Sequence, residues 1–354
     1  SKSKSDRFEY IYPNYRYSKD LENSYFSNGN LNFESHGYQK QYNTNVYDGV
    51  LINDINFDSS PSYSKKGIKN NYQILFRNVN SKSSNSGNYN EDASSKILSS
   101  LQFNTKFPLH KKTTKSENYL TPLASIRLSP NNTKNIKDLN RPVNYNSIFS
   151  LDRFGQNDLV EGGGSLTIGL EYSNRNKNNR EIVNLSLANV LRPSKNEDLP
   201  LNNSIGEKRS DIIGNFNFTP SDTFSLDYEF SLDNNLNDSN LNIIRTNFSV
   251  NNFITSFEFL EEDNLMGSKS YVSNKTTLNL DNNNSISFKT NKDLDKNITE
   301  YYNLIYEYKN DCLIAGVEYN KSNYADGDLK PEENLFFKIK IIPFGELNSP
   351  SVKQ

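Results

Sequence analysis

The chain has 354 residues, 40 of them basic and 42 acidic, so its formal net charge is −2. Because the two signs are interspersed, we expect no basic surface for nucleic acid. Hydrophobic residues make up only 34%, too few to fill a soluble core of this size well, but 22 Tyr and 21 Phe argue against disorder, since disordered chains are poor in aromatic residues.

The apolar runs in the sequence are short, as in residues 313–317. A membrane-spanning helix needs about 20 apolar residues, so none is predicted. The opening residues, SKSKSDRF, lack the apolar stretch of a secretory signal. Either a signal has been removed or the chain is an inner part of a longer protein, and we favour the second interpretation.

The first third of the chain, residues 1–118, is a polar mixture of Asn, Ser, Lys and Tyr. Residues 72–76 and 98–103 are predicted to be strands separated by long loops. The histidines His36 and His110 have no nearby nucleophile or ligand cluster, so both are interpreted as surface residues. Lys111 and its neighbour form a small basic cluster that is interpreted as a charged loop tip.

From residue 119 onward the dominant pattern is alternation of apolar and polar residues, which predicts strands with two different faces. In residues 224–232, Phe and Leu with one Tyr occupy one face, and Ser, Asp and Glu occupy the other. The same alternation recurs at 166–172, 302–308, 313–319 and 335–341. Segments rich in Asn, Asp, Ser and Gly lie between these runs and favour turns, so successive strands should pair as hairpins.

The pattern predicts an all-β fold, an antiparallel transmembrane β-barrel of the outer membrane. Between residues 162 and 344 we expect about eleven strands of about ten residues, the length of a tilted strand that crosses a bilayer. The whole chain would then hold about 16–20 strands and form an incomplete barrel. A soluble β-sandwich is the alternative, but it would need two inner faces in one dry core.

Three segments carry an ordered pattern of residues. The central one contains Phe149, Leu151, Asp152, Arg153, Asp158, Glu161, Gly162, Gly163, Gly169 and Tyr172. An upstream segment runs from Tyr119 to Pro130 and includes Arg127, and a downstream one contains Ser210, Asp211, Gly214 and Pro220. In order as well as in composition, these segments resemble the LptD family of lipopolysaccharide-assembly proteins. The resemblance covers residues 119–344, followed by a short polar tail, 345–354.

Some of these residues also have an interpretation that is independent of the resemblance. The run of glycines from Gly162 suits a tight or bulged start of a strand. A phosphate-binding loop would need a Lys and a following helix, and neither is present. Asp152 and Arg153 are interpreted as ion-pair partners or loop anchors.

The resemblance implies transport without chemistry, so we expect no catalytic residue, no cofactor and no metal. The saccharide of lipopolysaccharide would pass through the lumen, and the acyl chains would leave through a lateral gate between the first and last strands. Leu335, Phe337, Ile339 and Ile341 would form one lip. Pro343 would weaken strand pairing there, and Phe344 resembles the terminal ring read by the barrel-assembly machinery.

The implied partners are lipopolysaccharide, outer-membrane lipid, an LptE-like plug lipoprotein and an LptA-like periplasmic bridge that would be reached through an N-terminal domain outside this chain. Cys312 lies where the family carries cysteines that pair with that domain; an unpaired thiol in the barrel wall is the alternative. A general outer-membrane porin or receptor barrel is the alternative function. An outer-membrane hydrolase and a soluble Asn-rich adhesin are more distant ones.

Overall fold

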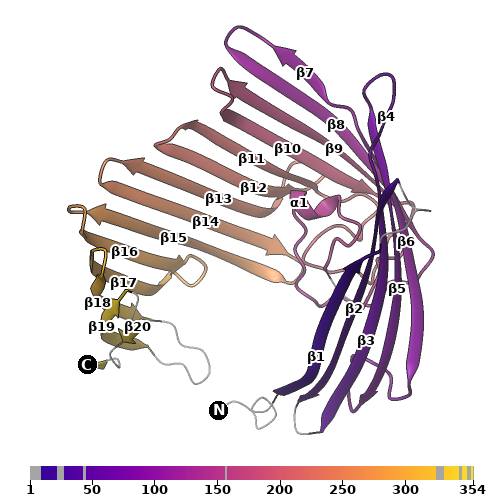
Figure 1. The fold of residues 1–354 in the computed structure, drawn as a ribbon, viewed down its shortest axis with the longest axis horizontal. Coiled ribbons are helices and arrows are strands. Elements are labelled where there is room, and N and C mark those ends of the chain that lie inside the picture. The colour runs from indigo at the N-terminus through magenta and orange to yellow at the C-terminus, as the bar shows by residue number, and fades with distance from the viewer. Residues whose placement is uncertain are drawn as a thin grey trace. The chain divides into compact units, whose positions relative to one another are not determined.

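The structure is a computed structural model that describes residues 9–21, 28–42, 45–155, 158–323, 331–342, 345–348 and 352–353. Its strands join in one 21-stranded sheet, and the described part holds one short helix, α1 (Tyr145–Ile148) (Figure 1). Every strand pair whose register is recorded is antiparallel, for example β2 with β3 and β17 with β18. The predicted all-β antiparallel fold is therefore confirmed. Among the described residues, no helix is long and apolar enough to cross a membrane.

The chain divides into two compact units, and the first comprises residues 1–113, 117–172 and 186–214. Its long strands pair in the order β1–β2–β3–β5–β6–β8. They are longer than the sequence pattern suggested for this polar region. The bounds of the strands up to β8 are β1 (Glu9–Asp20), β2 (Gly29–Tyr42), β3 (Val46–Ser59), β4 (Ser62–Tyr63), β5 (Lys69–Ser84), β6 (Ser94–Lys106), β7 (Leu109–Lys112) and β8 (Ser116–Ser129).

The first unit has an exposed apolar face and a buried face. Ile55 lies opposite Phe76 and Leu101 lies opposite Leu128, and all four side chains are exposed. Successive side chains of a strand point to opposite sides, so the residues between them form the other, inner face. That inner face carries buried residues such as Ile52, Asp54, Arg77, Gln102 and Arg127.

The second unit comprises residues 114–116, 173–185 and 215–354, and β9 and β10 contribute residues to both units. Eleven strands from β9 to β19 occupy the range in which about eleven were predicted. Their bounds are β9 (Gly163–Asn176), β10 (Glu181–Leu191), β11 (Ile212–Ser221), β12 (Phe224–Leu232), β13 (Ser239–Val250), β14 (Phe253–Asn264), β15 (Gly267–Asn279), β16 (Asn284–Asp293), β17 (Ile298–Lys309), β18 (Leu313–Ser322) and β19 (Glu332–Ile341).

The second unit also has two different faces. Phe224 lies opposite Phe248 and Tyr228 lies opposite Ile244, which continues the apolar face from β12 into β13. On the other face, Arg245 forms ion pairs with Glu229 at 2.7 Å and Glu258 at 2.6 Å. The alternation in the sequence therefore predicted which side chains share a face.

The C-terminal strand β19 is followed by two short strands that fold back onto it. Residues 338–341 of β19 pair with β20 (Gly345–Asn348), and Asn334 and Leu335 pair with β21 (Val352–Lys353). The strand expected at 335–344 thus ends at Ile341, because the chain turns there and hydrogen-bonds back. Pro343 and Phe344 lie outside the described residues.

Candidate functional site

Two long segments, 130–162 and 192–211, leave the first unit's strands and fold into a core of their own. Ile148, Leu159, Leu199 and Ile205 are almost completely buried in one apolar cluster, together with Val190 of β10. Burial of this apolar surface stabilises the segments by about 25 cal/mol per Å². The helix α1 belongs to the first segment, and Asn144 caps it by accepting a hydrogen bond from the Ser147 amide at 3.1 Å.

Glu161 is the centre of a buried charged cluster, which we call the Glu161 cluster. Its carboxylate contacts Arg127 of β8 at 2.7 Å and Arg153 at 3.3 Å, and it also pairs with Arg192. The side chains of all four residues are at most 3% exposed. Buried charges are tolerated when they are paired and hydrogen-bonded, so this cluster ties both long segments to the wall.

The guanidinium groups of the Glu161 cluster have further partners besides the carboxylate. Arg127 donates to the backbone carbonyl of Glu161 at 3.1 Å. Arg153 donates to Thr167 Oγ1 of β9 at 2.9 Å, and Arg192 donates to the carbonyl of Ile205 at 2.7 Å. These bonds hold each arginine in place, so the cluster is a rigid support rather than a mobile charge.

A second buried pair anchors the same segment to the inner face. Arg77 of β5 holds the carboxylate of Asp54 on β3 through two bonds of 2.9 and 2.7 Å. It also donates to the carbonyl of Leu159 at 2.7 Å and lies 3.5 Å from Asp152. Burial raises the pKa of Asp152, and the nearby Arg77 charge opposes that rise. Asp152 and Arg153 thus pair with different partners, Arg77 and Glu161.

A polar cavity of about 530 Å³ lies between this segment and the inner faces of β2 and β3. Asp158 at its wall accepts hydrogen bonds from Lys134 at 2.6 Å and from the Tyr89 hydroxyl at 2.7 Å. Burial alone would raise the pKa of Asp158, but these two bonds lower it below its usual value. Burial and the same carboxylate raise the pKa of Tyr89. Lys40 and Arg141 also line the cavity, as do Asp48 and Asp138, so its walls carry both signs of charge.

The glycines of the central motif meet specific backbone needs. A Cβ on Gly162 would lie 2.1 Å from the carbonyl oxygen of Asn131, so no side chain fits there. Gly163 opens β9 with a φ of 83°, in the region that favours glycine. Phe149 accepts a bond from Gln102 at 2.7 Å through its carbonyl, and its ring lies near Gly169.

The downstream motif residues lie at the junction of β10 and β11. Ser210 is fully buried; its hydroxyl accepts a bond from the Val190 amide at 2.9 Å and donates to the Asp211 carbonyl at 2.8 Å. Asp211 is buried as well, and its amide donates to Ser204 at 2.7 Å. Gly214 follows in β11 and is buried. These residues therefore fix the return of the second long segment to the wall.

The other predicted site residues lie in the second unit. Cys312 is exposed in the turn between β17 and β18, and its carbonyl accepts a bond from the Ile342 amide at 2.8 Å. Phe337, Ile339 and Ile341 of β19 are exposed on its apolar face, and Leu335 is half-buried. Within the described ranges, no three His, Cys, Asp or Glu side chains are arranged to hold a metal ion.

Sequence reasoning did not single out Arg77 or Arg192, and it noted Arg127 only as part of a motif. Each of these arginines lies far along the chain from the acid that it pairs with, so spacing gave no sign of the contact. Arg77 of β5 and Arg127 of β8 lie at inward positions of strands in which buried and exposed residues alternate. A charged residue at such a position is the one local signal that could have indicated a buried pair.

An extended antiparallel sheet, apolar on one face and polar with buried charges on the other, defines the outer-membrane β-barrel class. Over residues 54–264 the sequence matches the family described as LptD, LPS transport system D. The chain therefore belongs to the LptD family, a family of lipopolysaccharide transport, and its location is the outer membrane. A search of curated proteins with the sequence finds no match.

Among solved structures, the chain is similar to the siderophore receptor PirA from Acinetobacter baumannii, with 8% identity and a TM-score of 0.44. That similarity covers 94% of this chain and 65% of the receptor. A triple mutant of the Rhodopseudomonas blastica porin is 10% identical, with a TM-score of 0.30, and the similarity covers 83% of this chain and 93% of the porin. The chain thus spans less than two thirds of the receptor's length.

Proposed function

We propose that this chain forms wall and inner loops of a translocon that inserts lipopolysaccharide into the outer leaflet of the outer membrane. The saccharide of lipopolysaccharide would move along the polar inner face, and the acyl chains would leave sideways into the bilayer. This division follows from solvent preference, because an unsatisfied polar group costs several kcal/mol in hydrocarbon. Family membership and the two-faced wall support the proposal.

The observation that carries the proposal is the Glu161 cluster beside the polar cavity. Buried ion pairs hold the two long segments on the inner face. The segments give that face a fixed surface that is not flat. The cavity next to them is lined by three cations, Lys40, Lys134 and Arg141, and by three carboxylates, and with the hydroxyl of Tyr89 this polar lining suits a sugar. A general porin, the alternative function, would keep a water-filled lumen open for ions.

The lengths of the connections support an orientation in the membrane. Outer-membrane barrels have short periplasmic turns and longer extracellular loops. In the first unit the segments 130–162 and 192–211 therefore belong to the extracellular end. In the second unit the turns 222–223, 251–252 and 310–312 belong to the periplasmic end.

Cys312 lies in one of these short turns and is exposed. We propose that it pairs with a cysteine of a periplasmic domain that also joins an LptA-like bridge. Non-reducing electrophoresis of the full-length protein checks this, because Cys312→Ser should abolish the disulfide-linked form. An LptE-like lipoprotein as plug and the barrel-assembly machinery remain proposed partners on the same grounds of family membership.

The strand β19 is our proposed lip of the lateral gate. Its register places Lys340 opposite Glu346 of β20, so the chain's own terminal residues cover part of its free edge. β20 would have to separate from β19 before the gate could open or another strand could pair with this edge. Cross-linking a cysteine at Lys340 to the first strand of the full-length barrel should stop lipopolysaccharide from reaching the surface without unfolding the barrel.

A site-specific cross-linking experiment tests the transport path. A photo-reactive amino acid at Lys40, in the inner cavity, should form adducts with lipopolysaccharide in living cells. The same group at Lys65, in the exposed connection 60–68, is the control and should form none. Adducts at Lys40 should disappear when the periplasmic supply of lipopolysaccharide is cut off. Equal adducts at both positions would contradict passage along the inner face.

A further inference from the structure

A ladder of polar side chains crosses the outward face of the first unit, on the side opposite the Glu161 cluster. The Ser35 hydroxyl donates to Asn53 at 2.9 Å, and Asn78 donates to Ser95 at 3.1 Å. Asn53 and Asn78 are joined by a bond of 3.4 Å, and Tyr15 lies 3.2 Å from Ser35. The ladder therefore runs through β1, β2, β3, β5 and β6 without a gap.

This ladder is the boundary of the apolar part of the outward face. On one side of it lie Phe33, Ile55 and Phe76, which occupy consecutive positions across β2, β3 and β5. Polar groups in hydrocarbon must be hydrogen-bonded to one another, and the ladder meets that need. Beyond it, the outward residues of the same strands are no longer predominantly apolar, so this part of the wall suits the level of the lipid headgroups.

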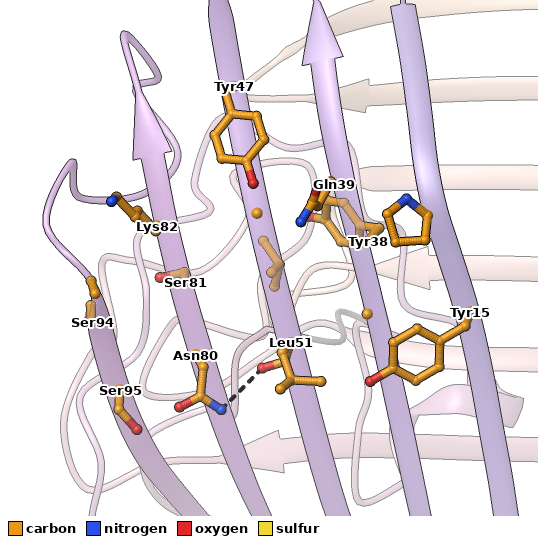
Figure 2. A pocket seen from close by; sticks show the side chains of 15 residues that line it. Tyr15, Tyr38, Gln39, Tyr47, Leu51, Asn80, Ser81, Lys82, Ser94 and Ser95 are labelled. Carbon is orange, nitrogen blue, oxygen red and sulfur yellow. Dashed lines mark hydrogen bonds between the residues drawn. The ribbon is translucent and has the colours of Figure 1, made fainter.

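Beyond the ladder the wall is hollowed by a cavity of about 540 Å³, which we call the outer-wall groove (Figure 2). Gly37 and Gly49 are among its lining residues, and Figure 2 shows Tyr15 and Tyr47, which also line it. A Cβ on Gly37 would lie 2.5 Å from the Tyr15 ring, and one on Gly49 would lie 2.8 Å from the Tyr47 hydroxyl. A side chain at either position would displace the neighbouring ring, so the two glycines leave room for the rings to lie against the strands.

The chemistry of the groove combines one cation, polar groups and an apolar margin. Lys82 lies opposite Gly49 in the register and projects at one edge of the groove (Figure 2). No carboxylate among the described residues pairs with Lys82. Asn80 donates to the Leu51 carbonyl at 3.4 Å, and the Leu51 side chain is exposed. Tyrosines are typical of the interface between headgroups and acyl chains.

The groove lies at the end of the wall from which the segment 130–162 leaves. β8 ends at Ser129, and its Leu128 lies opposite Leu101 of β6, so β8 runs toward the end of β6 that carries Ser94 and Ser95. Under the proposed orientation this end is extracellular, which places the groove in the outer leaflet. The lipid of that leaflet is the one that the proposed function delivers.

We propose that the outer-wall groove binds the headgroup of a lipopolysaccharide molecule already in the outer leaflet. Lys82 contacts a phosphate, the two tyrosines and Asn80 contact sugar, and an acyl chain lies along Leu51. The inference rests on the proposed function for its orientation. It adds a lipid-binding site on the outside of the wall, separate from the transport path.

The test uses the intact protein purified in detergent, so that it does not depend on transport. A photo-reactive amino acid replaces Ser95 at the groove or, as control, Ile97, the next outward residue of β6. Each is irradiated with increasing amounts of rough lipopolysaccharide, alone or with phosphatidylglycerol as competitor. Lys82→Ala removes the cation from β5, and Lys96→Ala, as a matched control, removes a charge from the inward side of β6, the strand that carries Ser95.

We expect a saturable lipopolysaccharide adduct at position 95 that excess phosphatidylglycerol does not displace. Lys82→Ala should weaken it about fivefold, since one lysine near a lipid surface contributes about 1 kcal/mol. Lys96→Ala should leave it unchanged, and adducts at 97 should not respond to either variant. An adduct that Lys82→Ala leaves intact, or that phosphatidylglycerol displaces fully, would overturn the proposal. If cells that carry the protein show normal surface lipopolysaccharide but the purified protein forms no such adduct, the groove alone is rejected and the transport function stands.

Discussion

Glu161→Gln is the most informative substitution because it removes one charge from a site where three arginines meet. The change keeps the size of the side chain but leaves Arg127, Arg153 and Arg192 without their shared anion. Their remaining hydrogen bonds, to backbone carbonyls and to Ser165 and Thr167, are neutral. Breaking a buried pair by removing one partner costs about 3–5 kcal/mol. We therefore expect the attachment of the long segments to the inner face to weaken by about 3–5 kcal/mol. The strands should stay paired.

Limited proteolysis combined with heat modifiability on gels measures this effect. The barrel should still migrate as a folded species, whereas cleavage within 130–162 should become much faster. Glu207→Gln is the control, because Glu207 pairs with Lys195 at 2.8 Å with both side chains about half exposed. Exposed pairs contribute about 0–1 kcal/mol, so this variant should resemble the wild type. Identical cleavage of both variants would refute the role assigned to the Glu161 cluster.

Leu226→Arg should destabilise the barrel by about 2–4 kcal/mol if it lies near the midplane, and Ser225→Arg on the polar face by much less; equal shifts in denaturant titrations in lipid would contradict the two-faced wall. Gly162→Ala should expose the neighbouring segment to protease, because its Cβ would meet backbone, while Gly164→Ala should not, since its nearest contact would be 3.4 Å. Folding lowers the pKa of Asp158, so its carboxylate contributes to the stability of the folded segment above the unfolded pKa near 3.8, and this contribution is lost as pH falls through the folded pKa. Hydrogen exchange of the segment should show this acid sensitivity, and Asp158→Asn should abolish it.

The sequence was informative about strands and their faces. Alternation in residues 224–232 and 335–341 follows from the geometry of a strand between lipid and a polar lumen, and β12 and β19 show it. Residues 1–118 were harder, because their outward positions include the Ser35, Asn53 and Asn78 ladder. Polar residues on both faces hide the period of two, so strands there were expected to be fewer and shorter than β2, β3 and β5.

The site was only partly predictable. Asp152, Arg153 and Glu161 were identified through a resemblance, but nothing in their order showed that Glu161 binds three arginines. Those contacts depend on strand pairing, which brings β8 and the end of β10 to the same segment. Register is a property of the whole sheet, and a one-residue shift would turn Arg127 to the other face.

The composition of the Glu161 cluster also bears on the order of assembly. Its arginines come from β8, from the segment after it and from the first residue of the segment that follows β10, so the cluster can form only after β8, β9 and β10 have come together. Interactions that form late in folding mainly slow unfolding rather than speed folding. We therefore expect the cluster to extend the lifetime of the finished protein, whereas the rate at which newly made chains enter the membrane should hardly depend on it.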